Sequence, residues 1–165
     1  IELRTELSKI NIKSLEPNEL LQMILEKVCV YKGWPLGHVY EVHHNKSLLQ
    51  LRSLKIWHVA IEDAKIEQFR KISEHYVFES GEGLPGRVYE AGSVQTIHDV
   101  TKDANFPRAE LAHDIGVRGA FAFPLLHGER VKYVLEFFSL EPEMLDPSVM
   151  ELMKHVSDYI SKGVV

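Results

Sequence analysis

The chain has 165 residues, of which 45% are hydrophobic and 26% charged, and its formal net charge is −5. These values fit one globular domain with its own core. The acidic balance argues against a nucleic-acid surface, and no apolar run approaches the roughly 20 residues of a membrane span, so we expect contact with neither. The single cysteine, Cys29, excludes an intrachain disulfide and fits the reducing cytoplasm, where we expect the protein to be.

Hydrophobic periodicity divides the chain into helices and strands. Within 2–14 the apolar residues recur at helical spacing, so we assign 1–16 to an N-terminal helical or linker segment and 17–165 to one folded domain. In chain order, the predicted elements are a helix over 17–32, strands over 38–43 and 48–59, a helix over 62–74, a short strand over 76–78, a helix over 84–91, a strand over 94–97, a helix over 107–115, strands over 119–126 and 131–139, and a helix that begins at Asp146-Pro147.

The order of these elements predicts the fold class. Strands that follow one another closely form antiparallel hairpins, and the longest helices lie at the two ends of the predicted domain. An antiparallel sheet with its helices segregated from the strands belongs to the α+β class.

The stretch from Gly81 to Ser139 carries the most distinctive motifs. It opens with a run in which three glycines and a proline specify a bent loop before a short helix. The motifs, in order, are Gly81-Glu82-Gly83-Leu84-Pro85-Gly86-Arg87-Val88-Tyr89, Asp99-Val100, Asn105-Phe106-Pro107-Arg108-Ala109, Gly116-Val117-Arg118 and Leu135-Glu136-Phe137-Phe138-Ser139. This ordered set resembles the GAF domains, small-molecule-sensing modules attached to bacterial signalling enzymes.

The resemblance covers about residues 18–163 and has consequences for the fold. It implies a central antiparallel sheet of about five to six strands. The N- and C-terminal helices would cover one face of this sheet. Short helices and loops would cover a pocket on the other face.

The same resemblance implies a function. The run from Gly81 to Ser139 is similar to GAF modules beside histidine kinases, PAS domains and diguanylate cyclases, which suggests a sensory, non-catalytic domain. An unidentified small molecule would alter the packing around 84–115, and terminal helices, commonly parallel across a homodimer in this family, would carry the change to an output domain. We read the chain as a segment of a longer polypeptide that holds this output domain.

Two alternatives from other classes stay open. A dimerisation module without a ligand is the first, because large aromatic side chains can fill the pocket completely. An enzyme of the branch that reduces free methionine sulfoxide is less favoured. That chemistry needs several cysteines, and Cys29 lies alone on the apolar side of a predicted helix.

The last predicted hairpin gives a geometric prediction about the pocket. A tight turn around Gly128 pairs Leu126 with Val131, which would place Phe121 opposite Glu136. Opposed residues share a face of the sheet, so we expect the phenylalanines at 121 and 123 on the same face as Glu136, looking into the pocket. The alanines of the same strand would then face the terminal helices. A slip of one residue would reverse this assignment for one of the strands.

Charged residues near this pocket have two interpretations each. Glu136 stands among apolar neighbours, so it needs a partner: a ligand group, or Arg118 or Arg87 of the chain itself. Arg87 and Arg108 begin short helices, where they could bind a carboxylate or phosphate, and Arg108 could equally pair with nearby aspartates. The glycine loop lacks the phosphate-binding pattern and is predicted to be a structural turn. The predicted ligand-binding residues are Trp57, Phe78, Arg87, Ile97, Arg108, Ala112, Phe121, Phe123 and Glu136.

The sequence disfavours the known cofactors of similar domains. Related phytochrome domains attach bilin through a cysteine where this chain has 109–113 without one, and no cyclic-nucleotide signature follows Asn45-Lys46. No histidines have metal-ligand spacing on a predicted element; His98 and His113 are the two to test as haem ligands. We therefore predict no catalytic residue and no metal site, and leave the ligand unidentified.

Overall fold

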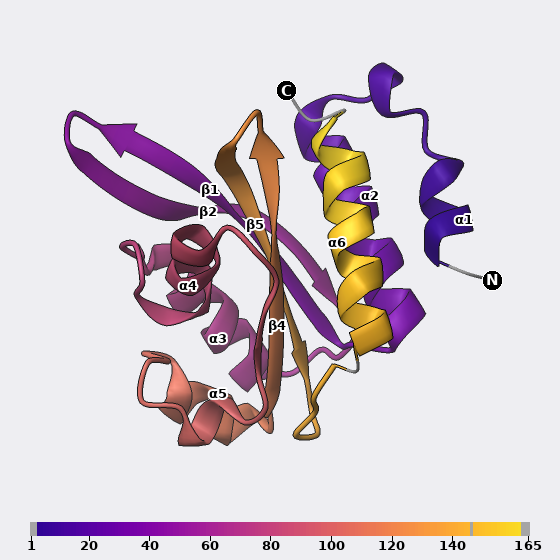
Figure 1. Ribbon diagram of the computed structural model, residues 1–165. Helices are drawn as coiled ribbons and strands as arrows, with labels where there is room; N and C mark the ends of the chain where they lie inside the picture. Colours follow the sequence, from indigo (N-terminus) through magenta and orange to yellow (C-terminus); the bar gives the residue numbers. More distant parts are fainter. Residues whose placement is uncertain (1–2, 146, 163–165) are drawn as a thin grey trace.

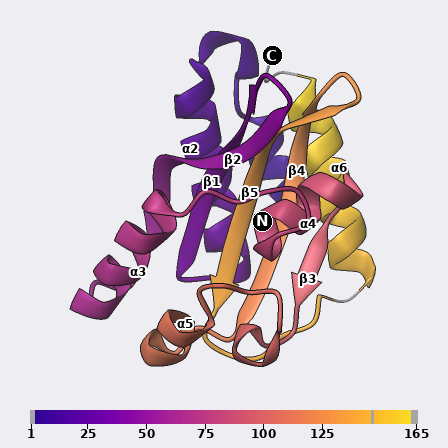
Figure 2. The same cartoon turned by 90° about the vertical axis from the view of Figure 1, so that its left-hand side faces the viewer.

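A five-stranded antiparallel sheet divides the protein into two helical layers (Figure 1). The computed structural model describes residues 3–145 and 147–162. The terminal-helix layer contains α1 (Leu3–Ser8), η1 (Ile12–Ser14), α2 (Pro17–Lys32) and α6 (Pro147–Ser161). The short-helix layer contains α3 (Ala64–His75), α4 (Gly83–Ala91), η2 (Val100–Lys102) and α5 (Ala109–Ile115) (Figure 2). The predicted α+β class, with the terminal helices segregated on one face, is confirmed.

The sheet places one strand at its centre. The strands are β1 (Leu36–Asn45), β2 (Leu48–Val59), β3 (Gln95–Ile97), β4 (Gly119–His127) and β5 (Arg130–Ser139). Their order is β2-β1-β5-β4-β3, and every neighbouring pair is antiparallel. Because β1 and β4 flank β5 and helices cover both faces, the residues of β5 from Tyr133 to Ser139 are buried on both sides of the sheet.

Each layer encloses its own apolar core. The first core joins α2 and α6 to one face of the sheet, through Ile24 and Val28 of α2 and Val156 of α6. The second core joins α3, α4 and α5 to the other face, around Phe69 and Phe138. In the described residues, no helix is both long enough and apolar enough to span a bilayer.

The last hairpin corrects the predicted register. Leu126 does pair with Val131, but a bulge follows, so that Leu125 pairs with Tyr133 and Phe121 pairs with Phe137. A bulge inserts one unpaired residue, which reverses the faces of all residues beyond it on one strand relative to the other. The prediction that Phe121 and Phe123 share a face with Glu136 is therefore wrong. Both belong to the core of the terminal-helix layer.

The alanines of β4 lie opposite to the prediction as well. Ala120 and Ala122 belong to the core of the short-helix layer, where α4 packs against β4. Helix α4 is also closely packed against the turn before it, because a Cβ added to Gly86 would collide with the carbonyl oxygen of Glu79. The small residues do admit a helix, but that helix is α4.

The other elements differ from prediction mainly at their ends. The predicted strand over 76–78 is reduced to a single bridge between Leu51 and Phe78. The predicted helix over 107–115 begins at Ala109, because Arg108 has non-helical backbone angles, and it ends at Ile115, where Gly116 caps it with a φ of 80°. Asp146, the predicted start of the last helix, lies outside the described residues.

Candidate functional site

A buried ion pair occupies the middle of the short-helix layer. Glu136 projects from the central strand β5. The side chain of Arg108, the residue that precedes α5, reaches it. Nη1 of Arg108 lies 2.8 Å from Oε1 of Glu136, and Nη2 lies 3.0 Å from Oε2. The exposed fraction is 2% for Arg108 and 0% for Glu136. This two-pronged geometry is the strongest that an arginine and a carboxylate form.

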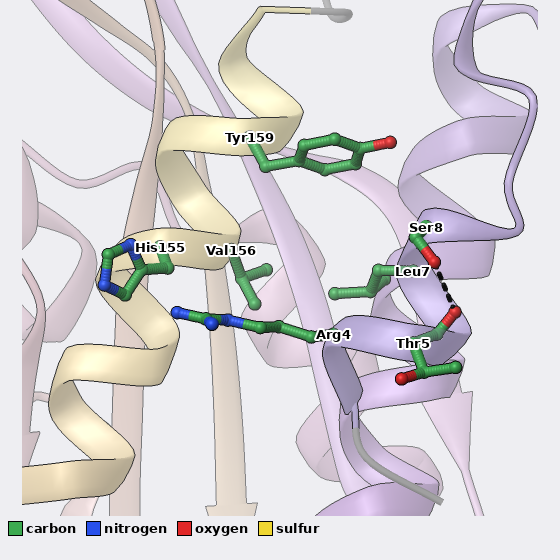
Figure 3. Close-up of a pocket in the computed structure, with 7 residues that line it drawn as sticks. All are labelled: Arg4, Thr5, Leu7, Ser8, His155, Val156 and Tyr159. Carbon is green, nitrogen blue, oxygen red and sulfur yellow. Dashed lines mark hydrogen bonds between the residues drawn. The ribbon is translucent and has the colours of Figure 1, made fainter.

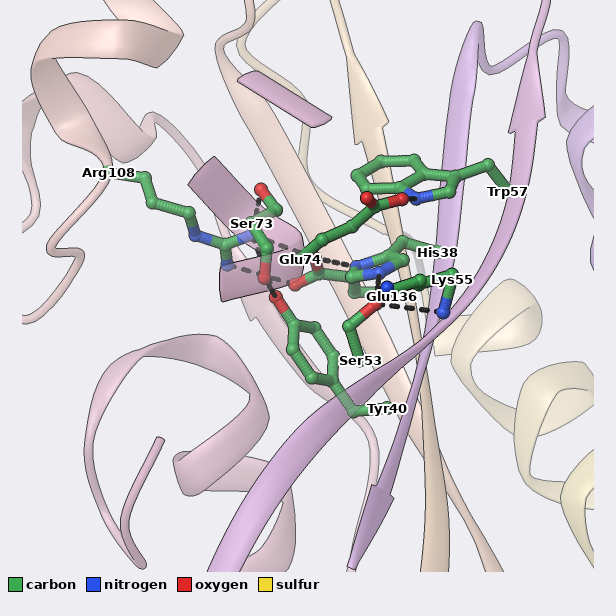
Figure 4. Close-up of polar contacts among 9 residues, drawn as sticks. All are labelled: His38, Tyr40, Ser53, Lys55, Trp57, Ser73, Glu74, Arg108 and Glu136. Atoms are coloured by element: carbon green, nitrogen blue, oxygen red, sulfur yellow. Dashed lines mark hydrogen bonds and ion pairs between the residues drawn. The ribbon is translucent and has the colours of Figure 1, made fainter. Parts of the chain in front are cut away.

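A histidine extends the ion pair toward the edge of the sheet. Nδ1 of His38, on β1, lies 3.1 Å from Oε1 of Glu136, and its Nε2 lies 2.7 Å from Oγ of Ser53 on β2. The backbone N–H of Lys55 donates to the same hydroxyl at 2.9 Å. Since Glu136 only accepts, Nδ1 carries the proton and Nε2 accepts from Ser53. Figure 4 shows the Glu136 carboxylate between Arg108 and His38.

Two further polar groups complete the arrangement. Nη1 of Arg108 donates to Oγ of Ser73 at 3.1 Å and to the hydroxyl of Tyr40 at 3.3 Å. The hydroxyl of Tyr40 donates to the carbonyl oxygen of Ser73 at 3.3 Å. These side chains form what we call the buried polar cluster: Arg108, Glu136, His38, Tyr40 and Ser73.

Four phenylalanine rings surround the guanidinium of Arg108. Its central carbon lies 4.9 Å from the ring centre of Phe106, 5.0 Å from Phe78, and 5.6 Å from both Phe69 and Phe138. Aromatic faces attract cations through their quadrupole, most strongly where water is excluded. We call these four rings the aromatic cage; it encloses a cation, and the cation present is a side chain of the protein itself.

The charges of the cluster balance within it. Burial raises the pKa of Glu136, but the Arg108 charge and hydrogen bonds from His38 and Arg108 outweigh it and lower the pKa to about 2. Burial lowers the pKa of His38, whose imidazole is therefore neutral at neutral pH. Burial raises the pKa of Tyr40, so its phenol stays protonated. The cluster holds one cation, one anion and no net charge.

The loop before α5 is fastened to α4. The side-chain oxygen of Asn105 accepts the backbone N–H of Gly83 at 2.9 Å, and its nitrogen donates to the carbonyl oxygen of Gly81 at 2.9 Å. Arg87 of α4 pairs with Asp103 of the loop. The glycine-rich turn thus serves as a docking point for the loop that delivers Arg108.

The structure brings together only part of the predicted site. Phe78, Arg108 and Glu136 meet directly, and Trp57 joins them through His38, on whose ring it stacks at 3.8 Å. Arg87 lies apart, in its pair with Asp103. Ile97 and Ala112 line the same core. Phe121 and Phe123 lie on the other side of the sheet.

The residues missed by the sequence prediction come from the first strand and from the helices. His38 and Tyr40 alternate in a predicted strand, which places them on one face, but local pattern does not show that β1 pairs with β5. Phe106 stands two residues before Arg108 in a motif already singled out. Phe69 and Ser73 are one helical turn apart on α3, a spacing that gives them a common face without showing what they touch.

A separate cavity lies within the terminal-helix layer. It has a volume of about 480 Å³ and separates α1 from α6, with the Arg4 side chain extending toward α6 (Figure 3). Its lining residues are Arg4, Thr5, Leu7, Ser8, His155, Val156 and Tyr159. In the ranges 3–145 and 147–162, no group of three or more histidine, cysteine, aspartate or glutamate side chains has the arrangement of a metal site.

Comparisons with known proteins agree with this architecture. A family model described as GAF domain matches residues 14–164, so the chain belongs to the GAF domain family. No sequence among curated proteins matches the chain.

Similar solved structures include an enzyme and two GAF domains. The chain superimposes on free methionine-R-sulfoxide reductase from Neisseria meningitidis with a TM-score of 0.70 at 13% identity, covering 98% of this chain and 83% of that one. The GAF domain of an Acinetobacter phosphoenolpyruvate-protein phosphotransferase gives a TM-score of 0.67 at 12% identity, covering 98% and 87%. The nlh2 GAF domain of A. aeolicus gives 0.62 at 18% identity, covering 98% and 90%. At these identities the likeness defines the fold alone.

Proposed function

We propose that this chain is a non-catalytic sensory domain of a cytoplasmic bacterial signal-transduction protein. A small molecule binds in the short-helix layer, at the buried polar cluster, and alters how α5 packs. The terminal helices carry the change to an output domain, a histidine kinase or a diguanylate cyclase, elsewhere in the polypeptide. Membership of the GAF family supports the regulatory, ligand-binding role in general terms.

One observation carries the proposal: a complete set of polar groups converges beneath short helices on an otherwise apolar sheet face. Burying a charge pair costs more than packing apolar residues of similar volume at the same place. Such a cluster is therefore weak support for stability, and buried ionisable groups with shifted pKa values gather at functional sites. Glu136, held at the centre of the sheet, is the residue we assign to ligand recognition.

The position of Glu136 on β5 supplies a route from the site to the terminal helices. Its neighbours Leu135 and Phe137 point to the opposite face and belong to the core that contains α2 and α6. Phe137 in turn lies 5.4 Å, ring centre to ring centre, from Trp34, which follows α2. A shift of β5 that accompanies ligand binding changes the packing of the helices. The ligand acts only as far as it binds one arrangement more tightly than the other.

Dimerisation through the terminal helices is part of the proposal. Four apolar side chains of α2 and α6 remain exposed: Val30 at 73%, Tyr31 at 43%, Met150 at 37% and Tyr159 at 44%. We assign these side chains to the dimer contact, since an interface between helices needs exposed apolar groups. Sedimentation velocity of the wild type against the double variant Val30→Glu/Tyr159→Glu tests this part. A dimer that persists in the variant contradicts it.

Hydrolytic catalysis is the chemistry to set aside. The side chains of Ser53, His38 and Glu136 are hydrogen-bonded in series, as are the serine, histidine and carboxylate of a serine hydrolase triad. However, His38 is 0% exposed and stacked on Trp57, so that no leaving group can reach its Nε2. Both carboxylate oxygens also bind Arg108, which weakens Glu136 as a partner for a charged imidazole.

A ligand-free dimerisation module is the second candidate. The observation that favours it is the closure of the site, where Arg108 already satisfies Glu136 and the aromatic cage is occupied. Mass spectrometry of small molecules released from the purified protein distinguishes the two. A stoichiometric compound that also raises the melting temperature supports the sensor. Repeated absence of any such compound, with an intact dimer, supports the module.

A further inference from the structure

We propose that the site is built for a small organic cation with a guanidinium or amidinium head group, and that Arg108 is its built-in substitute. The ligand takes the place of the Arg108 guanidinium in the aromatic cage and releases α5. This inference rests on the proposed sensory function and names the class of its ligand.

The fixed parts of the site are those that recognise a cation. Glu136 and Phe138 stand on the central strand β5, and Tyr40 stands on β1. Phe78 is tied to β2 by two backbone hydrogen bonds with Leu51, of 2.8 and 3.1 Å. Without Arg108 these walls present a carboxylate, a phenol and aromatic faces, which together form a receptor for positive charge.

The cation itself is buried, but it is attached to the least buried helix of the layer. Arg108 precedes α5, and of the seven residues of that helix only Ala112 is buried. Segments with few buried contacts are the first to open locally. Arg108 is therefore the group that can leave, while the part of the receptor carried by β1 and β5 keeps its strand pairing.

The closed state is also imperfect. Within the described chain, Nε of Arg108 is buried and has no hydrogen-bond partner. A buried donor without a partner is unfavourable, since it has lost its water without compensation. A free guanidinium is not tethered to α5 and can turn to satisfy its remaining N–H groups.

Charge balance selects the class of ligand. A neutral ligand in place of Arg108 would leave Glu136 buried and unpaired, and an anionic ligand would add a second negative charge beside it. A monovalent cation leaves the cluster neutral. The planar fork of a guanidinium or amidinium further matches the two carboxylate oxygens, which a compact ammonium does not.

The test compares n-propylguanidinium, which reproduces the arginine side chain, with n-propylurea, a neutral molecule of the same shape. In the variant Arg108→Ala, we expect n-propylguanidinium to raise the melting temperature saturably. Its binding should be at least about tenfold tighter than to the wild type, where it competes with the tethered group. Neither effect should appear with n-propylurea, nor with n-propylguanidinium in Arg108→Ala/Glu136→Gln.

The wild type provides a second measurement that does not depend on the variant folding. Binding of n-propylguanidinium should speed amide hydrogen exchange in Ala109–Ile115, while the hydrogen-bonded ladder between β4 and β5 stays protected from exchange. Equal exchange of α5 with and without the probe overturns the proposal, as does an equal response to n-propylurea.

Failure of this inference can be told from failure of the proposed function. A neutral or anionic molecule that co-purifies in this layer overturns the cation assignment and keeps the sensor. Tight binding of n-propylguanidinium without any change in exchange of α2 and α6 keeps the cation site and contradicts the relay.

Discussion

Arg108 and Glu136 meet in two parallel hydrogen bonds of 2.8 and 3.0 Å although they are 28 residues apart in sequence and come from different structural layers. Glu136 belongs to the sheet, and Arg108 belongs to the loop that covers it. The ion pair is therefore formed only when the loop that carries Arg108 is closed over the sheet. Both partners are buried. Removing one of them would leave the other as an unpaired buried charge, whereas replacing both with apolar residues would leave none.

Removing one partner should be far more damaging than removing both. We expect Glu136→Leu to lower the free energy of unfolding by about 3–5 kcal/mol, because Arg108 is left buried without a counter-charge. The double variant Arg108→Met/Glu136→Leu should recover most of this loss. Urea denaturation of both variants gives the values.

An exposed ion pair serves as the matched control. Arg70 and Glu67 on α3 are 3.1 Å apart and partly exposed, at 31% and 53%. Glu67→Gln should change the free energy of unfolding by no more than about 1 kcal/mol. A double variant in the buried pair that is as unstable as Glu136→Leu would contradict the balance of charges described for the cluster.

His38 should make the protein less stable as the pH falls. Its pKa is lowered in the folded state by burial, so below the ordinary value of 6.5 the unfolded chain binds more protons than the folded one. Stability then rises with pH across this range and is lost on acidification, by up to about 1.4 kcal/mol per pH unit for one proton. Unfolding by urea at a series of pH values between about 5 and 8 measures the slope.

The variant His38→Asn isolates this contribution. Its amide nitrogen can donate to Glu136 as Nδ1 does, but it does not titrate. The difference between wild-type and variant slopes cancels the other histidines. Equal slopes would mean that His38 is not held neutral. Glu136 adds a second loss at lower pH, since its pKa of about 2 lies below the ordinary 4.5 and its contribution disappears between these values.

The outline of the fold can be predicted because it depends on local pattern. The helical spacing in 17–32 and the alternation in 48–59 are set by neighbouring residues, and both elements form where expected. The glycine-rich turn and the cap at Gly116 depend on one or two backbone positions, which composition reveals. These features require no knowledge of what lies across the molecule.

The site is predicted only in part because its partners are fixed by tertiary structure. The sequence marks Glu136 as needing a partner but suggests Arg118 and Arg87 for it, and it offers Arg108 a ligand or nearby aspartates; the structure instead pairs Arg108 with Glu136. The pairing of β1 with β5, which brings His38 to Glu136, is a long-range choice. The error in the hairpin has a smaller cause: one bulge reverses the face of every residue beyond it.

The corrected register predicts which tryptophan senses a change at Phe121. Phe121 stacks on Trp34 at 4.5 Å, whereas Trp57 stacks on His38 on the other face of the sheet. Phe121→Ala should cost about 3–5 kcal/mol of stability through the cavity it leaves. It should shift the indole N–H resonance of Trp34 in the NMR spectrum and leave that of Trp57 in place. A shift confined to Trp57 would restore the register without the bulge.

The environment of Cys29 bears on whether this chain has the activity of the methionine sulfoxide reductase that it resembles in fold. The thiol is buried, and burial raises its pKa well above the ordinary value, so the reactive thiolate is not formed. It also fills a close contact: a Cβ added to Gly37 of β1 would lie 2.8 Å from its sulfur. The side chain thus packs α2 onto the sheet, on the face away from the buried polar cluster.

We therefore expect no reduction of free methionine-R-sulfoxide with a dithiol as reductant, measured as methionine released. A thiol reagent should modify Cys29 only as fast as the protein unfolds, because the buried sulfur is reached only in the open chain. Turnover by the wild type that is lost in Cys29→Ala would show instead that this thiol reaches a substrate, and the non-catalytic assignment would be wrong.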